Sequence, residues 1–402
     1  MKYWRGFLVA LIFGVITWGL NAFAAGHTAL VDMVYPYMTR MIVGSLADWS
    51  SGTTASLWQA LLMLLIAGGI ASIVLMIVLR WNPIQWLGWV LAVVFCVNMC
   101  STLIFGLNTY AGPVSEDVRL TMTDYTVDEL AEATKYYRDK ANELATKVSR
   151  DGKGNVETPS FEELAVQAEN GFKNLTYRDA MSLFAGSTAP VKKLSWSGLY
   201  GSRSGVTVAL TGEACVNPNV PELFLPFAMC KEMSRRMTVV QEEDAKYAGF
   251  LAAAANDSEL FQYSAYCVAY YHCYSALAAI PTDTARQAAK QVHQGAEKLL
   301  AQDMALYEDF FGDYTDPDGD SMADMLTSWY IQEFVTPTLV EVEDPFDPLD
   351  KNMVDLTYEK PTPTPLEEVA TKPTEAEDED DTEGDALADD EWTDEEEEEE
   401  DT

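Results

Sequence analysis

The residues whose spacing is most suggestive of chemistry lie between Cys230 and Arg235, which read Cys-Lys-Glu-Met-Ser-Arg. On a helix, residues four positions apart share one face, and H-E-x-x-H uses this spacing to hold zinc while its glutamate activates water. Here Lys231 and Arg235 stand at the two histidine positions and Glu232 stands at the glutamate. The pattern predicts a helix with the layout of a zinc site but without its imidazoles.

Other catalytic or metal-binding patterns are weak. The three histidines, His27, His272 and His293, have no second histidine at helical spacing, so we assign none of them to a metal. The aspartate-rich turn 316–320 begins like an EF-hand loop, but Ser321 and Thr327 replace the glycine and glutamate that the loop needs. The sequence contains no G-x-S-x-G, P-loop or dinucleotide-binding motif.

Charge is distributed very unevenly along the chain. The 402 residues carry a formal net charge of -37, yet residues 1–107 hold only two acidic residues, Asp32 and Asp48. All the other acidic residues follow residue 107. Such a surface repels nucleic-acid phosphates and anionic lipid headgroups, so we expect neither as a ligand.

Apolar runs at 7–25, 57–79 and 84–107 each approach the roughly 20 residues that a helix needs to cross a membrane. The first run also fits a signal peptide ending near Ala24, and the sequence leaves its cleavage open. We expect a membrane domain over 1–107 with three transmembrane helices.

Basic residues set the expected orientation. Lys2, Arg5 and Arg80 flank the runs and are predicted to lie on the cytoplasmic side, which places everything from Asn108 onward outside the cell membrane. The segment 26–56 then becomes a short external loop, either re-entrant or interfacial, whose serine-rich end caps the second membrane helix.

Downstream of the spans, the periodicity predicts a mainly helical domain over 108–357. A small hairpin or edge strand is expected within 194–210, where glycine and serine alternate with valine and leucine. Helices are expected over 128–148, 160–171, 224–237, 241–255, 259–279 and 282–311. Residues 150–155 form a turn-rich break, in which Arg150 is expected to be an isolated surface arginine.

Residues 358–402 have a different character. A Pro/Thr-rich stretch leads into an acidic tract that cannot bury enough apolar surface to offset its ordering entropy, so it is predicted to be disordered. We expect the tail to attract divalent cations weakly.

Of the six cysteines, Cys96 and Cys100 fall within the third apolar run. Cys215, Cys230, Cys267 and Cys273 lie in the expected external domain, and whether they form disulfides depends on distances that the sequence does not give. No C-x-x-C spacing occurs, so a zinc ribbon is excluded.

Several segments together resemble a bacterial membrane protein family known as domain of unknown function 3810. Its members carry N-terminal transmembrane helices followed by an H-E-x-x-H domain. The resemblance covers about 35–357 and rests on the following segments: Phe105-Gly106-Leu107-Asn108-Thr109-Tyr110, Gly212-Glu213-Ala214-Cys215-Val216-Asn217, Pro226-Phe227-Ala228-Met229-Cys230, Tyr263-Ser264-Ala265-Tyr266 and Asn352-Met353-Val354-Asp355-Leu356.

The resemblance implies a zincin-like fold in which Lys231, Arg235 and Glu242 stand at the three metal-ligand positions, so the ligand set is degenerate. Glu242 would be the third ligand, with Asp244 the weaker candidate, and Glu232 would be the remnant general base. A protein zinc site is worth on the order of 10 to 16 kcal/mol. One cation about 4 Å from a divalent ion opposes it by roughly 8 kcal/mol at an effective dielectric near 20. With two ligands replaced by cations, we predict no zinc and no other cofactor. Instead, Lys231 and Arg235 should form ion pairs with the segment 242–244.

These inferences favour a membrane-anchored pseudo-metallopeptidase that binds or scaffolds partner proteins at the cell envelope. Two alternatives remain open at this stage. One is an active membrane-bound hydrolase with an unrecognised site, and the other is a structural envelope protein that interacts through its acidic tail.

Overall fold

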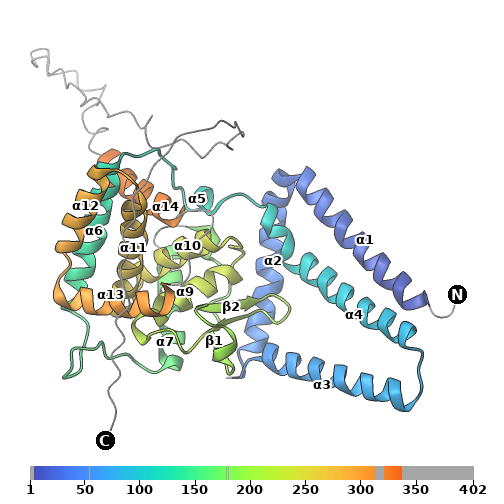
Figure 1. The fold of residues 1–402 in the computed structure, drawn as a ribbon. Coiled ribbons are helices and arrows are strands. Elements are labelled where there is room, and N and C mark those ends of the chain that lie inside the picture. The colour runs from blue at the N-terminus through green and yellow to red at the C-terminus, as the bar shows by residue number, and fades with distance from the viewer. Residues whose placement is uncertain (1–3, 54, 178, 180, 313–320, 337–402) are drawn as a thin grey trace, which may run out of the picture. The chain divides into compact units, whose positions relative to one another are not determined.

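The computed structural model describes residues 4–53, 55–177, 179, 181–312 and 321–336. The expectations for the acidic tail 358–402, the turn 316–320 and the segment 352–356 lie outside these described residues. The described chain is mainly helical, with one small sheet (Figure 1).

Three helices are long and apolar enough to cross a membrane, which indicates a multi-pass membrane protein. They are α1 (Arg5–Gly26), α3 (Leu57–Val78) and α4 (Pro83–Ile104), close to the predicted spans. As expected, a serine caps α3, because the Ser56 side chain accepts a hydrogen bond from the Gln59 N–H. Helices α1 and α4 approach so closely that a Cβ added to Gly6 would lie 2.4 Å from the carbonyl carbon of Gly88.

The prediction of a loop over 26–56 is wrong, because most of this segment is helix α2 (Thr28–Ser50). Helix α2 is amphipathic, with Val31, Val43 and Ala47 buried on one side. Charged residues such as Asp32 interrupt its apolar residues, so the segment does not read as a continuous apolar run. Tyr35 of α2 donates a hydrogen bond to the Thr102 carbonyl of α4 at 2.8 Å. Helix α2 therefore connects a membrane helix to the rest of the fold.

A 3₁₀ turn, η2 (Gly106–Tyr110), follows α4, and the helices of the domain after it begin with the short α5 (Val114–Asp117). The longer ones are α6 (Val127–Ala145), α7 (Phe161–Gln167), α8 (Glu169–Tyr177), α9 (Leu225–Arg236), α10 (Glu242–Ala254), α11 (Glu259–Ala279), α12 (Asp283–Gln294), α13 (Lys298–Phe311) and α14 (Ser321–Tyr330). Short 3₁₀ turns lie at η3 (Ser182–Phe184), η4 (Ser197–Leu199) and η5 (Glu222–Phe224), and a π-helical turn, η6 (Ile331–Val335), follows α14.

Most predicted helices are confirmed, but two are each divided. The expected helix 160–171 begins with the predicted capping box at Ser160 and divides into α7 and α8. The expected helix 282–311 breaks between α12 and α13, where Asn142 of α6 donates to the Gly295 carbonyl and accepts from the Glu297 N–H. This long-range side chain satisfies backbone groups at a helix end, and no local pattern reveals it.

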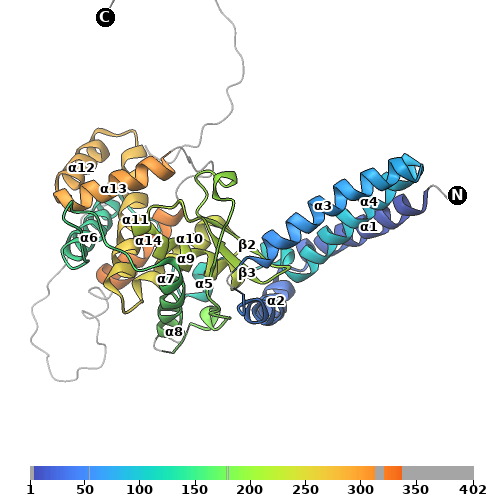
Figure 2. The same ribbon diagram turned by 90° about the horizontal axis from the view of Figure 1, so that it is seen from below.

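The sheet contains β1 (Lys192–Lys193), β2 (Gly205–Val208) and β3 (Glu213–Val216) in the order β1-β3-β2. Strands β2 and β3 are antiparallel, with Gly205 opposite Val216. Because β3 is the central strand, β2 is an edge strand. The predicted region of extended structure contains β2, whereas its partner β3 lies beyond it. The sheet packs against α9, as Figure 2 shows.

Buried polar groups fix the sheet to the membrane helices. The carboxylate of Glu213, in β3, is buried and accepts hydrogen bonds from the first N–H groups of α3, those of Leu57 at 2.8 Å and Trp58 at 2.7 Å. Lys192 of β1 donates to the Ser50 carbonyl at the end of α2 at 2.8 Å. A carboxylate at a helix N-terminus is stabilised by the helix dipole and by the otherwise unsatisfied N–H groups.

Arg150 is not the isolated surface residue that the sequence predicts. Its guanidinium Nη2 lies 2.7 Å from Oδ2 of Asp303 on α13, and the Asp303 side chain is only 1% exposed. Tyr263 of α11 donates to the same carboxylate at 2.6 Å. The turn at 150–155 is thus anchored to the helical core by a buried ion pair.

None of the six cysteines, all within the described residues, is joined in a disulfide. Cys215, Cys230, Cys267 and Cys273 are buried in the domain that follows the membrane helices, where they pack as small apolar side chains.

Candidate functional site

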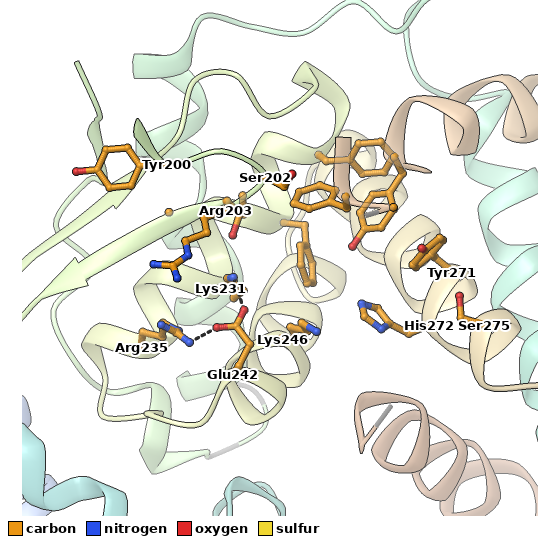
Figure 3. A pocket seen from close by; sticks show the side chains of 18 of the residues that line it. Tyr200, Ser202, Arg203, Lys231, Arg235, Glu242, Lys246, Tyr271, His272 and Ser275 are labelled. Atoms are coloured by element: carbon orange, nitrogen blue, oxygen red, sulfur yellow. Dashed lines mark hydrogen bonds and ion pairs between the residues drawn. The ribbon is translucent and has the colours of Figure 1, made fainter. Parts of the chain in front are cut away.

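A cavity of about 740 Å³ lies beside α9, the helix that carries Lys231, Glu232 and Arg235. It is lined by β2 and the loop before it and by side chains of α9, α10, α11 and α13 (Figure 3). Its volume falls within the range typical of pockets that enclose a ligand.

Lys231 and Arg235 occupy neighbouring turns of α9 and line this cavity. Figure 3 shows both side chains directed at the carboxylate of Glu242 on α10. The Nζ atom of Lys231 lies 2.7 Å from Oε1, while the Arg235 guanidinium pairs with the other oxygen, Oε2. The predicted ion pairs are therefore present, and one carboxylate serves both cations.

Asp244, the weaker candidate for the third ligand position, does not join this cluster. Its carboxylate lines a different cavity and accepts a hydrogen bond from the Val114 N–H at 3.4 Å. The ion pairs of Lys231 and Arg235 with the segment 242–244 are made to Glu242.

Electrostatics at Glu242 reflect two opposing effects. Burial raises the pKa of its carboxyl group, but the Coulombic attraction of Lys231 and Arg235 outweighs that effect and lowers the pKa to about 2. Glu242 is therefore ionised at neutral pH.

The close approach of α9 and α10 makes this geometry possible. Gly249 of α10 faces Lys231 of α9, and a Cβ added to Gly249 would lie 2.8 Å from the Lys231 Cα. Between the helices, Thr238 adopts a positive φ of 84°, which allows a tight turn after α9. Glu242, in the first turn of α10, thereby returns to the motif.

Glu232, the position of the remnant general base, lies next to this cluster, with its Oε1 3.6 Å from the Lys231 Nζ. It is fully buried, is not among the residues that line the cavity, and its Oε2 accepts a hydrogen bond from Thr207 of β2 at 3.0 Å. A Cβ added to Gly205 of β2 would lie 2.7 Å from the Glu232 Cγ. The edge strand thus covers the carboxylate that would otherwise face a substrate.

The residues present do not fit a zinc ion at this position. Lys231 and Arg235 bring positive charge to two ligand positions and already share the Glu242 carboxylate. Across the described residues, no three His, Cys, Asp or Glu side chains gather closely enough to hold a metal. A divalent ion would have to displace an ion pair and then face two cations.

The three histidines have different surroundings. His272 of α11 lines the cavity, a role that the sequence did not suggest. His293 lies beside the ring of Tyr274 on α11, and His27 stacks on Phe23 at the end of α1.

Sequence reasoning also missed Arg203, an exposed arginine in the loop before β2 that lines the same cavity (Figure 3). The spacing in Gly201-Ser202-Arg203-Ser204-Gly205 could have signalled a loop, but not its position opposite α9. Arg236, next to the motif, faces away and donates to the Ser187 and Ala189 carbonyls at 2.8 and 2.7 Å.

In comparison with known protein families, residues 31–330 match the family described as protein of unknown function (DUF3810). Comparisons with curated proteins and with solved structures found no match.

Proposed function

We propose that this chain, which belongs to the DUF3810 family of unknown function, is a membrane-anchored pseudo-metallopeptidase with a zincin-like domain. In this proposal the domain binds an extended polypeptide in the cavity and does not cleave it. The protein would thereby act in binding or scaffolding at the cell envelope.

The shared Glu242 carboxylate is the observation that carries this proposal. Lys231 and Arg235 stand four residues apart on α9, and both reach the side chain at the position of a third metal ligand. Two organic cations thus balance a carboxylate that a divalent ion would otherwise neutralise. Such an arrangement keeps the local charge balance of a metal site without a Lewis acid.

The cavity walls favour a polypeptide as the ligand. Edge strand β2 lines the cavity through Gly205 and Val206, and an unpaired strand edge can receive an extended peptide as an additional strand. Arg203 and Arg235 also line the cavity, and the buried Nε of Arg235 has no hydrogen-bond partner in the described part of the chain. These guanidinium groups favour a peptide that carries carboxylates.

The proposal places the domain outside the cytoplasmic membrane, because Lys2, Arg5 and Arg80 flank the spans on the opposite side. Protease added to intact cells should then digest the domain and the acidic tail. Protection of both until the cells are lysed would overturn this orientation.

The binding function can be tested with the full chain in detergent and fluorescently labelled, random twelve-residue peptides. We expect saturable binding that favours acidic peptides, no cleavage products by mass spectrometry, and well under one zinc per chain. Arg203→Glu should weaken binding at least tenfold, whereas Arg286→Glu, on the exposed face of α12, should leave it unchanged. About one zinc per chain together with chelator-sensitive cleavage would contradict the proposal.

A further inference from the structure

A second cavity, of about 450 Å³, lies between α2 and the domain that follows the membrane helices. It is lined by parts of α2, η2, α5 and the first turn of α10. Asp244, the weaker candidate for the third ligand position, lines it, but this second cavity shares none of its lining residues with the cavity beside α9.

Negative charge predominates in this cavity. Three carboxylates line it, those of Asp32 on α2, Asp117 on α5 and Asp244 on α10, against one guanidinium, that of Arg40 on α2. Among the described residues, Arg40 makes no ion pair with any of the three. Its guanidinium instead donates to the Leu183 carbonyl at 3.2 Å and lies over the ring of Tyr37.

The carboxylates are only partly satisfied by protein donors. Asp32 accepts from the Gly112 N–H at 2.8 Å, and Asp244 accepts from the Val114 N–H at 3.4 Å. Asp117 accepts no hydrogen bond from a described residue. Burial raises the pKa of Asp117, Arg40 partly opposes that effect, and the charge of Asp32 raises the pKa further. Burial likewise raises the pKa of Asp244, and the charge of Asp117 adds to the effect.

A separate observation concerns Asn108 of η2, which also lines the cavity and is only 4% exposed. Its Nδ2 donates to the Phe105 carbonyl at 2.8 Å and to Thr39 Oγ1 at 3.2 Å, which fixes the orientation of the amide. The Oδ1 atom is buried and has no hydrogen-bond partner among the residues that the structure describes. A buried acceptor without a donor costs free energy, so it indicates a donor that is supplied from elsewhere.

From these observations we propose that this cavity binds an organic cation that carries an ammonium or guanidinium group. The ligand would donate hydrogen bonds to Asn108 Oδ1 and to Asp117, and its charge would relieve the mutual repulsion of Asp32, Asp117 and Asp244. A bare metal ion fits less well, because no three carboxylates in the described residues gather at coordination distance and the cavity is far larger than one ion.

The test uses the full chain in detergent at about 150 mM salt, with spermidine and argininamide as probes and calcium chloride as the comparison ion. Isothermal titration should show saturable binding of at least one of the two amines and none of calcium. Asp117→Asn and Asp244→Asn should each weaken that binding at least tenfold. Asp128→Asn, which removes an exposed carboxylate at the start of α6, is the matched control and should have no effect.

A stability measurement separates a binding role from a structural one. Without ligand, Asp117→Asn should unfold at the same temperature as the parent or at a higher one, because it removes one of the three like charges that line the cavity. Binding by neither amine to the folded protein would overturn the proposal. So would calcium binding alone, equal weakening by Asp128→Asn, or a lower unfolding temperature for Asp117→Asn.

Discussion

Lys231 on α9 and Glu242 on α10 form an ion pair of 2.7 Å between Nζ and Oε1, and Arg235 pairs with the second oxygen of the same carboxylate. Lys231 is the most buried of the three, with its side chain 9% exposed, compared with 25% for Arg235 and 33% for Glu242. The burial of this cluster is intermediate between that of a buried ion pair and that of an exposed one. Its contribution to the free energy of unfolding should be intermediate as well.

The first prediction concerns this burial. Lys231→Ala should lower the free energy of unfolding of the full chain by about 1 to 3 kcal/mol, between the 3 to 5 kcal/mol of a broken buried pair and the 0 to 1 of an exposed one. Urea unfolding in detergent measures this change. Arg286→Ala, in an exposed pair on α12, is the control and should cost less than about 1 kcal/mol. Equal costs for the two variants would show that solvent screens the cluster fully.

A second prediction follows from the pKa of Glu242, which is lowered to about 2. A carboxylate with a lowered pKa stabilises the fold above its ordinary pKa, near 4.5, and loses that contribution as the pH falls towards 2. The parent protein should therefore be more stable than Glu242→Gln at pH 6, and the difference should shrink between pH 4.5 and the lowest pH at which unfolding can be measured.

The matched control for this pH series is Glu157→Gln, which changes an exposed carboxylate. Its stability should differ little from the parent at any pH in the series. A difference for Glu242→Gln that stays constant down to about pH 2 would contradict the role of the ion pairs.

Restoring the imidazoles tests whether α9 and α10 keep the layout of a metal site. The double variant Lys231→His, Arg235→His should retain about one zinc per chain after dialysis, because two imidazoles at this spacing and Glu242 complete three ligands. Lys231→His alone should retain far less. Elemental analysis gives the answer, and a folded double variant without zinc would show that the two helices do not hold these positions.

The same double variant should show no peptidase activity. Glu232 lies beside Lys231, but it is buried, accepts a hydrogen bond from Thr207 and does not line the cavity, so we expect it not to activate a metal-bound water. Chelator-sensitive cleavage by the double variant would mean that Glu232 reaches the cavity.

The last prediction concerns the ion pair between Arg150 and Asp303, which the sequence did not suggest. Arg150→Ala should cost about 3 to 5 kcal/mol, because it leaves the buried Asp303 carboxylate with Tyr263 but without its cation. Thermal unfolding of the full chain, again with Arg286→Ala as control, measures the loss. A cost below about 1 kcal/mol would place Arg150 on the surface, as the sequence alone predicts.

The sequence by itself was enough to locate the three apolar helices and most of the others, since membrane spans and amphipathic helices leave strong local patterns. It also pointed to Lys231 and Arg235, because residues four apart on a helix share a face whatever surrounds them. Glu232 followed from its place in the same motif. Even the partner Glu242 could be expected, through its place in the family motif.

Tertiary structure decided what these side chains face. Whether Glu232 points into the cavity depends on where β2 lies. The local sequence of α9 does not show where β2 lies or that β2 pairs with β3. The burial of Arg150 depends on Asp303, and the cavity that contains Asp32, Asp117 and Asp244 draws on three separate helices. Charge, burial and hydrogen bonding at such places are set by residues far apart in the chain, which no local periodicity can record.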